Sequence, residues 1–104
     1  MQIQINTDHN IDGSDRLAVH VRGVVEEALE RFSDRITRVE VHLADENGAK
    51  TGTNDKRCVM EARLEHRRPA AVTHHAGTVD EAINGAAEKL KRLVESTVGR
   101  LADG

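Results

Sequence analysis

Aromatic residues are almost absent from this chain of 104 residues, which has no Trp, no Tyr and a single Phe, Phe32. Proteins that read unpaired RNA on a sheet surface stack the bases on aromatic side chains, at roughly 1–3 kcal/mol per base. Sugar-binding platforms and aromatic-anchored peptide grooves need the same side chains. The composition therefore argues against all three of these classes.

Cysteine is equally scarce, since Cys58 is the only one and cannot form an internal disulfide. The N-terminal region lacks the basic-then-apolar pattern of a secretion signal. No apolar run approaches the roughly 20 residues that span a bilayer. We therefore expect a cytoplasmic protein that does not interact with membranes.

What the chain does contain is 38% hydrophobic and 32% charged residues, with a formal net charge of −3. A length near 100 residues suits one hydrophobic core and is too short for two. We expect a single domain over residues 1–104. The acidic balance disfavours sequence-blind binding of bulk nucleic acid, although a local basic surface is compatible with it.

The hydrophobic pattern predicts an α+β fold with the order β-α-β-β-β-α. Period-two alternation predicts strands at 2–6, 35–43, 57–65 and 70–76. Two apolar stripes at helical spacing predict the helices: Leu17, Val21, Val24, Ala28 and Phe32, then Val79, Ile83, Ala86, Leu90, Leu93 and Thr97. Packing these faces together gives a four-stranded mixed sheet with two helices on one face, the first two strands parallel and the last three antiparallel.

Local signals refine this outline. Ser14 or Asp12 is the expected cap of the first helix, and Thr78 with Glu81 matches a capping box for the second. The polar segment 44–56 is expected to be a mobile loop. Gly23 and Gly85 each weaken a helix, so we expect both to lie where a helix approaches another element closely.

The sequence has no Gly-rich phosphate loop, nucleophile elbow or paired-cysteine metal site, so we expect no enzyme, no cofactor and no small-molecule substrate. Cys58 lies on the inward face of its strand and is expected to be a buried hydrophobe. His66, His74 and His75 form the most site-like cluster. Adjacent His74 and His75 point to opposite faces of a strand, so we expect no metal there.

Basic residues are more informative than the net charge. Lys89, Arg92 and Arg100 recur at a spacing that places them in one row beside the apolar stripe, with Lys91 nearby. Positions 56–68 hold a second concentration, which includes Arg67 and Arg68. Two interpretations remain open: ordinary solvated faces, or a surface that binds phosphates and recognises the shape of folded RNA.

Two segments resemble the ribosome hibernation-promoting factor and ribosome-associated inhibitor A family: RFSDRITRVEVHL at 31–43 and GTVDEAINGAAEKLKRL at 77–93. The resemblance spans nearly the whole chain and is that of a short form without a C-terminal dimerisation domain. It implies a non-enzymatic protein that binds the small ribosomal subunit near the decoding region and subunit interface, and that represses translation under stress.

The resemblance also implies that basic residues contact ribosomal RNA. Lys89 and Arg92 match basic positions of the family's second helix, and Arg100 one in its basic tail; with Lys91, Arg67 and Arg68 they are the expected RNA-binding residues. The chain departs from the family at 95–99, where relatives are Lys-rich, and at Asp80, where a Tyr is typical. Glu26, Glu27 and Glu30 stand where relatives tend to be basic.

An alternative interpretation follows from these departures. A divergent member without ribosome binding would act as a protein-interaction or stress-response module. The predicted strand 70–76 is weakly charged and expected at a sheet edge, which suits homodimerisation by strand addition.

Overall fold

The computed structural model describes residues 1–46 and 55–103, with side chains described as far as Gly99. The elements, in chain order, are β1 (Gln2–Thr7), α1 (Asp15–Leu29), the 3-10 helix η1 (Glu30–Phe32), β2 (Ile36–Asp45), β3 (Lys56–Leu64), β4 (Ala70–Ala76) and α2 (Val79–Asp103). This order confirms the predicted β-α-β-β-β-α fold. Most of the predicted mobile loop, residues 47–54, lies outside the described residues.

The strands of the described residues form one sheet in the order β1-β2-β3-β4. β1 pairs with β2 in parallel, and the other two pairings are antiparallel, as the sequence predicts. The register aligns Ile5, Val41, Met60 and Val72 in one row across the sheet. β4 therefore lies at an edge of the described sheet, where a leading Pro69 is tolerated.

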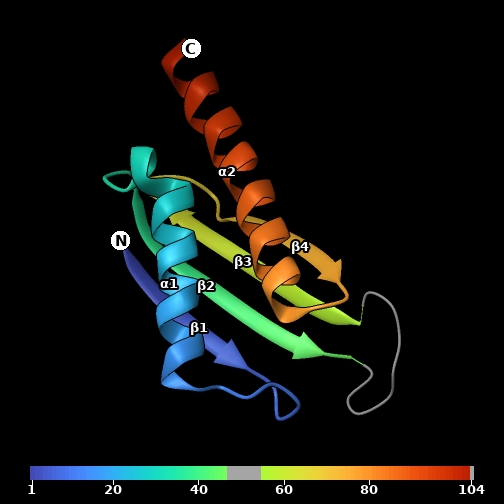
Figure 1. Cartoon of the computed structure of the whole chain (residues 1–104). Coiled ribbons are helices and arrows are strands. Elements are labelled where there is room, and N and C mark those ends of the chain that lie inside the picture. The colour runs from blue at the N-terminus through green and yellow to red at the C-terminus, as the bar shows by residue number, and fades with distance from the viewer. Residues whose placement is uncertain (47–54, 104) are drawn as a thin grey trace.

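Both helices cover the same face of this sheet, and α2 extends past its end (Figure 1). The side chains that alternate inward along β2 and β3 are buried beneath them, among them Val41, Cys58 and Met60. On α1 the fully buried line runs through Val21, Val25 and Leu29 rather than through Val24 and Ala28, which are half-buried. The buried line is therefore displaced by one residue from the predicted stripe, to the side on which α1 contacts α2 and β1.

Side-chain caps define where the helices begin. Ser14, not Asp12, caps α1: its Oγ accepts a hydrogen bond from the Leu17 N–H at 3.2 Å. Thr78 Oγ1 accepts from the Glu81 N–H at 3.1 Å, which confirms the predicted capping pair. The Glu81 carboxylate accepts from the Thr78 hydroxyl, whereas in a capping box it would accept from the backbone N–H.

The two helical glycines differ. A methyl group on Gly85 would lie 2.1 Å from Cδ2 of His74, so α2 approaches β4 closely here, as predicted. The same prediction is wrong for Gly23, because nothing lies within 4 Å of the position its Cβ would take. Gly23 is exposed on the outer side of α1, so no packing requirement accounts for it.

Candidate nucleic-acid interface

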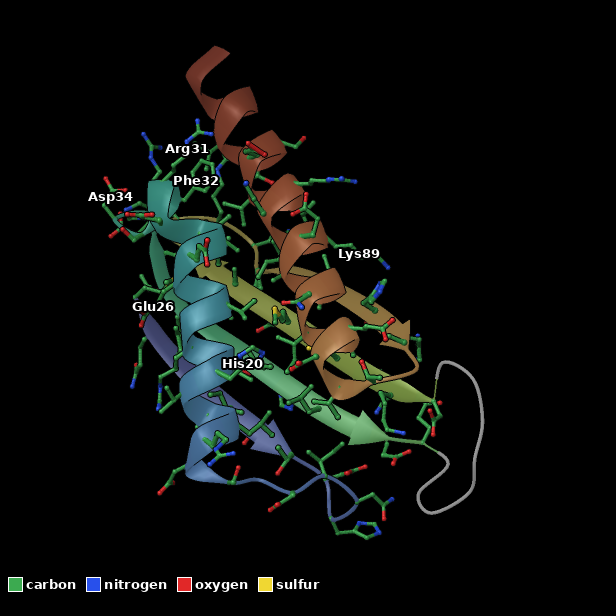
Figure 2. The ribbon with its side chains drawn as sticks, viewed as in Figure 1. His20, Glu26, Arg31, Phe32, Asp34 and Lys89 are labelled. Carbon is green, nitrogen blue, oxygen red and sulfur yellow. The ribbon has the colours of Figure 1, made fainter. Side chains whose placement is uncertain are left out.

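Lys89 and Arg92 lie on the exposed side of α2, clear of its buried stripe. Lys89 projects on the side of α2 that faces away from α1 (Figure 2). Its Nζ donates to the Thr73 carbonyl of β4 at 2.9 Å, which uses one of the three ammonium donors. Arg92 Nε lies 3.3 Å from Glu88 Oε1, and the Arg92 side chain is 75% exposed, so solvent weakens this pair. Both cations therefore remain accessible to a partner.

Lys91 does not share this surface. Helix geometry turns about 100° per residue, which separates Lys91 from Lys89 by about 200° around α2. Lys91 is half-buried in a groove between the helices, where Glu27 of α1 and Glu88 also lie. Arg100 belongs to α2, but its side chain lies outside the described residues.

Arg67 and Arg68 are exposed in the turn between β3 and β4. They line a hollow together with Leu93 and Thr97 of α2, so the turn lies beside the α2 segment that follows Lys89. No ion pair in the described part of the chain involves either arginine. We call Lys89, Arg92, Arg67 and Arg68 the basic edge.

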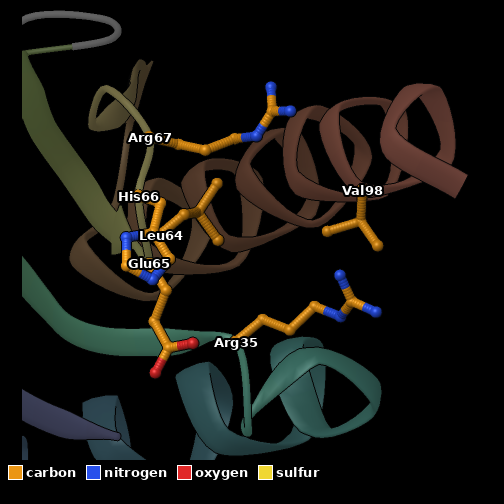
Figure 3. Close-up of a pocket in the computed structure, with 6 residues that line it drawn as sticks. All are labelled: Arg35, Leu64, Glu65, His66, Arg67 and Val98. Atoms are coloured by element: carbon orange, nitrogen blue, oxygen red, sulfur yellow. The ribbon is translucent and has the colours of Figure 1, made fainter. Parts of the chain in front are cut away.

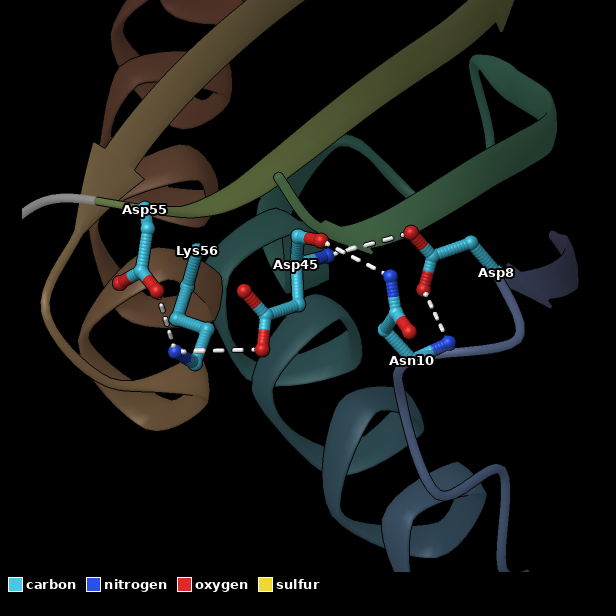
Figure 4. Close-up of polar contacts among 5 residues, drawn as sticks. All are labelled: Asp8, Asn10, Asp45, Asp55 and Lys56. Carbon is cyan, nitrogen blue, oxygen red and sulfur yellow. Dashed lines mark hydrogen bonds and ion pairs between the residues drawn. The ribbon is translucent and has the colours of Figure 1, made fainter. Parts of the chain in front are cut away.

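The remaining cations of the 56–68 segment are already paired. Arg57 lies 3.5 Å from Glu46, and Arg63 lies 3.6 Å from Glu61, both on the sheet face that the helices leave open. Lys56 Nζ lies 2.9 Å from Asp55 Oδ2 and 3.4 Å from Asp45 Oδ2, and both carboxylates are buried (Figure 4). Lys56 is therefore a structural residue, and only the turn of this segment contributes free cations.

The Lys56 contacts belong to a polar cluster that ties three strands together. Asp8, which follows β1, accepts the Asp45 N–H at 3.2 Å through Oδ2 and the Asn10 N–H at 3.0 Å through Oδ1. Asn10 Nδ2 in turn donates to the Asp45 carbonyl at 3.3 Å. The pattern of charges along the chain gave no signal for this cluster, because its members are brought together by strand pairing.

Acidic side chains occupy the other side of the helical layer. Glu26 and Glu27 of α1 and Glu30 of η1 are exposed, and Glu26 lies on the outer side of the molecule, away from Lys89 (Figure 2). Glu26 and Lys89 thus place charges of opposite sign on the two sides of the helical layer. An asymmetric distribution of this kind orients an approaching polyanion toward one side.

The cysteine and histidine residues that the sequence analysis considered as possible sites of chemistry lie outside the basic edge. Cys58 is fully buried, and burial raises the pKa of its thiol to about 12, so it is not a nucleophile. His74 packs beneath Gly85, while His75 is exposed with its Nε2 3.1 Å from Glu46 Oε1. Within the described part of the chain, no three His, Cys, Asp or Glu side chains gather as metal ligands would.

Arg35 was missed as a candidate by reasoning from spacing. It precedes β2 and lines a hollow together with Arg67 of the basic edge. The tripeptide Asp34-Arg35-Ile36 is part of the segment that carries the family resemblance, but the sequence offers no sign that Arg35 lies near the β3–β4 turn.

Among the described residues, no helix has the length and apolar character needed to cross a membrane.

Comparisons with known proteins agree with this fold. The family model described as sigma 54 modulation protein / S30EA ribosomal protein matches residues 3–102. The solved N-terminal domain of Thermus thermophilus Protein Y superposes with a TM-score of 0.74 at 18% identity, covering 93% of this chain and 99% of that one. A ribosomal subunit interface protein from Coxiella burnetii superposes with a TM-score of 0.67 at 17% identity, covering 94% and 99%. No curated protein sequence matches this chain.

Proposed function

Because the chain belongs to the sigma 54 modulation protein / S30EA ribosomal protein family, we propose that it is a ribosome-associated factor without enzymatic activity. It binds small-subunit ribosomal RNA near the decoding region and the subunit interface. By occupying that position it represses translation during stress, with no chemical step. The observation that carries this proposal is the basic edge, on a domain of the family's fold.

The basic edge suits recognition of RNA by shape. Lys89 and Arg92 are three residues apart on α2, and Arg67 with Arg68 extends the charge along the neighbouring turn. Cations spaced along an exposed edge contact successive phosphates and release counterions, which provides affinity without reading bases. The near absence of aromatic residues fits this mode, because phosphate contacts need no stacking platform.

Ribosome binding is tested by sedimenting a lysate of stationary-phase cells through a sucrose gradient. We expect the protein to travel with the small subunit or with whole ribosomes at low salt. The substitutions K89Q and R92Q together remove two phosphate contacts, so they reduce the slope of log affinity against log salt by about two. Thermal unfolding is unchanged, because both side chains lie outside the core.

The matched control is the pair R57Q and R63Q, which removes the same charge from the open face of the sheet. This pair is expected to leave the salt dependence at its wild-type value. Wild-type protein that stays at the top of the gradient at low salt contradicts the proposal. An equal loss from both double variants contradicts the assignment to the basic edge.

The alternative, a protein-interaction module that pairs through β4, has one supporting observation: β4 lies at an edge of the described sheet. One contact opposes it. Lys89 Nζ occupies the Thr73 carbonyl, an acceptor that an added strand would need. The ribosome-associated function is therefore the better supported of the two.

A further inference from the structure

Arg35 and Arg67 border a hollow of about 280 Å³ at the end of the molecule where η1, the β3–β4 turn and α2 meet. Its lining consists of Arg35, Leu64, Glu65, His66, Arg67 and Val98. The two arginine side chains extend from different segments of the chain toward the side on which Val98 lies (Figure 3). We call this feature the Arg35–Arg67 hollow.

Backbone hydrogen bonds hold both walls of the hollow in place. The Arg35 N–H donates to the Phe32 carbonyl at 2.9 Å, and the Arg35 carbonyl accepts from the Glu65 N–H at 3.1 Å. Across the hollow, the Arg67 N–H donates to the Leu64 carbonyl at 3.3 Å. His66 between them has a φ of 60°, a left-handed conformation that is uncommon outside glycine and that concentrates at functional sites.

The charges of the hollow suit a single phosphodiester. No ion pair in the described residues involves Arg35 or Arg67, so both guanidinium groups are free to bind a ligand. The two arginines and the carboxylate of Glu65 together give the lining a net charge of +1, with His66 counted as neutral. A guanidinium pairs with phosphate oxygens through two parallel hydrogen bonds.

The rest of the lining suits a nucleobase. The buried Leu64 and the half-buried Val98 are the apolar residues of the lining, and the exposed His66 supplies a flat ring. Arginine and histidine side chains stack on unpaired bases, and a carboxylate such as that of Glu65 accepts hydrogen bonds from base amino groups. A volume of about 280 Å³ lies just below the range of roughly 300–1,000 Å³ found for small-ligand pockets, so it accommodates one such group.

We propose that the Arg35–Arg67 hollow binds one unpaired nucleotide of an RNA strand. The phosphate lies between Arg35 and Arg67, and the base rests against Leu64 and Val98 beside His66. This inference rests on the proposed function for its partner, RNA. The hollow would recognise a nucleotide that is unstacked from the RNA helix. Phosphate contacts along the basic edge do not provide this recognition. An acidic peptide fits less well, because Glu65 repels a run of carboxylates.

The test compares three RNA hairpins of the same stem with purified protein: one fully paired, one with a single bulged nucleotide, and one whose bulge lacks the base. We expect wild-type protein to bind the bulged hairpin about tenfold more tightly than the paired hairpin, within the range of one stacked base. The hairpin without the bulged base loses most of this preference, because its phosphate alone remains.

Variants assign the preference to the hollow. R35A with R67A is expected to remove the preference for the bulge, and H66N to reduce it, since asparagine tolerates the left-handed backbone while removing the ring. The control pair R16A and R22A removes two exposed α1 arginines that have no ion pair in the described residues. It lowers the affinity for all hairpins equally and preserves the tenfold ratio. Circular dichroism confirms that each variant is folded.

The inference is overturned by equal binding of paired and bulged hairpins, by a loss of affinity in the R35A/R67A variant that is the same for both hairpins, or by no binding of any hairpin at low salt. Displacement of the bulged hairpin by polyglutamate but not by a bulged competitor also overturns it, in favour of an acidic peptide. These readouts use purified protein and RNA hairpins, whereas the proposed function depends on co-sedimentation with ribosomes. Either can fail while the other holds.

Discussion

At the scale of single residues, the most consequential contact is that of Lys56 with two buried carboxylates. Its hydrogen bond to Asp55 lowers the pKa of that carboxyl, and the same hydrogen bond raises the pKa of Lys56. A lowered carboxyl pKa contributes stability above the unfolded value near pH 4, which is lost as the pH falls through the folded value. A raised lysine pKa contributes stability below about pH 10, which is lost as the pH rises further.

The substitution K56M tests this role. It leaves Asp55 buried without the Lys56 ammonium that pairs with it, so we expect a lower melting temperature at neutral pH. The deficit relative to wild type shrinks between about pH 7 and pH 4, because protonation of Asp55 removes its uncompensated charge. Thermal unfolding followed by circular dichroism measures both effects.

The control for K56M is K89M, which removes an exposed lysine and leaves the melting temperature close to that of wild type. A deficit of K56M that is constant over the pH range contradicts the explanation by buried charge. So does a K89M deficit of the same size.

At the scale of the element, the two helical glycines differ in the space around them. Each is less favourable than alanine in a helix interior by about 1 kcal/mol. Gly23 faces open space, whereas a methyl group on Gly85 would overlap the His74 ring. The same substitution therefore has opposite expected effects in α1 and α2.

We expect G23A to stabilise the protein by about 0.5–1 kcal/mol through helix propensity alone. G85A is expected to destabilise it by about 1–2 kcal/mol, because the cost of overpacking against His74 exceeds the gain in propensity. Urea denaturation measures both changes. If the H74A background does not relieve the penalty of G85A, the overlap with the imidazole ring is not its cause.

At the scale of the whole molecule, charge and sheet edges decide which surfaces are available to partners. Glu26 lies on the outer side of α1, and Lys89 of the basic edge lies on the opposite side of the helical layer (Figure 2). β4 borders the basic edge, and Lys89 reaches across to its Thr73 carbonyl. A lysine at a strand edge discourages strand addition, because the added strand would displace a charged group from its hydrogen bond.

Light scattering at micromolar concentration is therefore expected to yield the mass of a monomer for residues 1–104. A stable dimer would favour the alternative function. The substitution T73P decides whether β4 forms such a dimer, since proline at this edge position removes a donor that an added strand requires. A dimer that survives T73P pairs through another surface.

Much of this fold is predictable because it depends on short-range periodicity. Alternation identified the strands, and the spacing of Leu90 and Ile83 identified the buried stripe of α2. The same helical period separates Lys89 and Arg92 from that stripe, so their exposure follows from the sequence alone. Thr78 and Glu81 are three residues apart, and the capping pair that they form is equally local.

The tertiary structure decided what lies far apart along the chain. Lys56 belongs to a basic segment by sequence, yet strand pairing places Asp45 opposite it, so that its ammonium pairs with Asp45 as well as with its neighbour Asp55. Arg35 and Arg67 are distant in sequence, and the pairing of β2 with β3 together with the turn at His66 brings them to one hollow. The sequence alone determined the helices and strands and the exposure of Lys89 and Arg92 on α2, because local periodicity sets both. Strand register and helix packing determined which charges are free, because those contacts join residues that no local pattern connects.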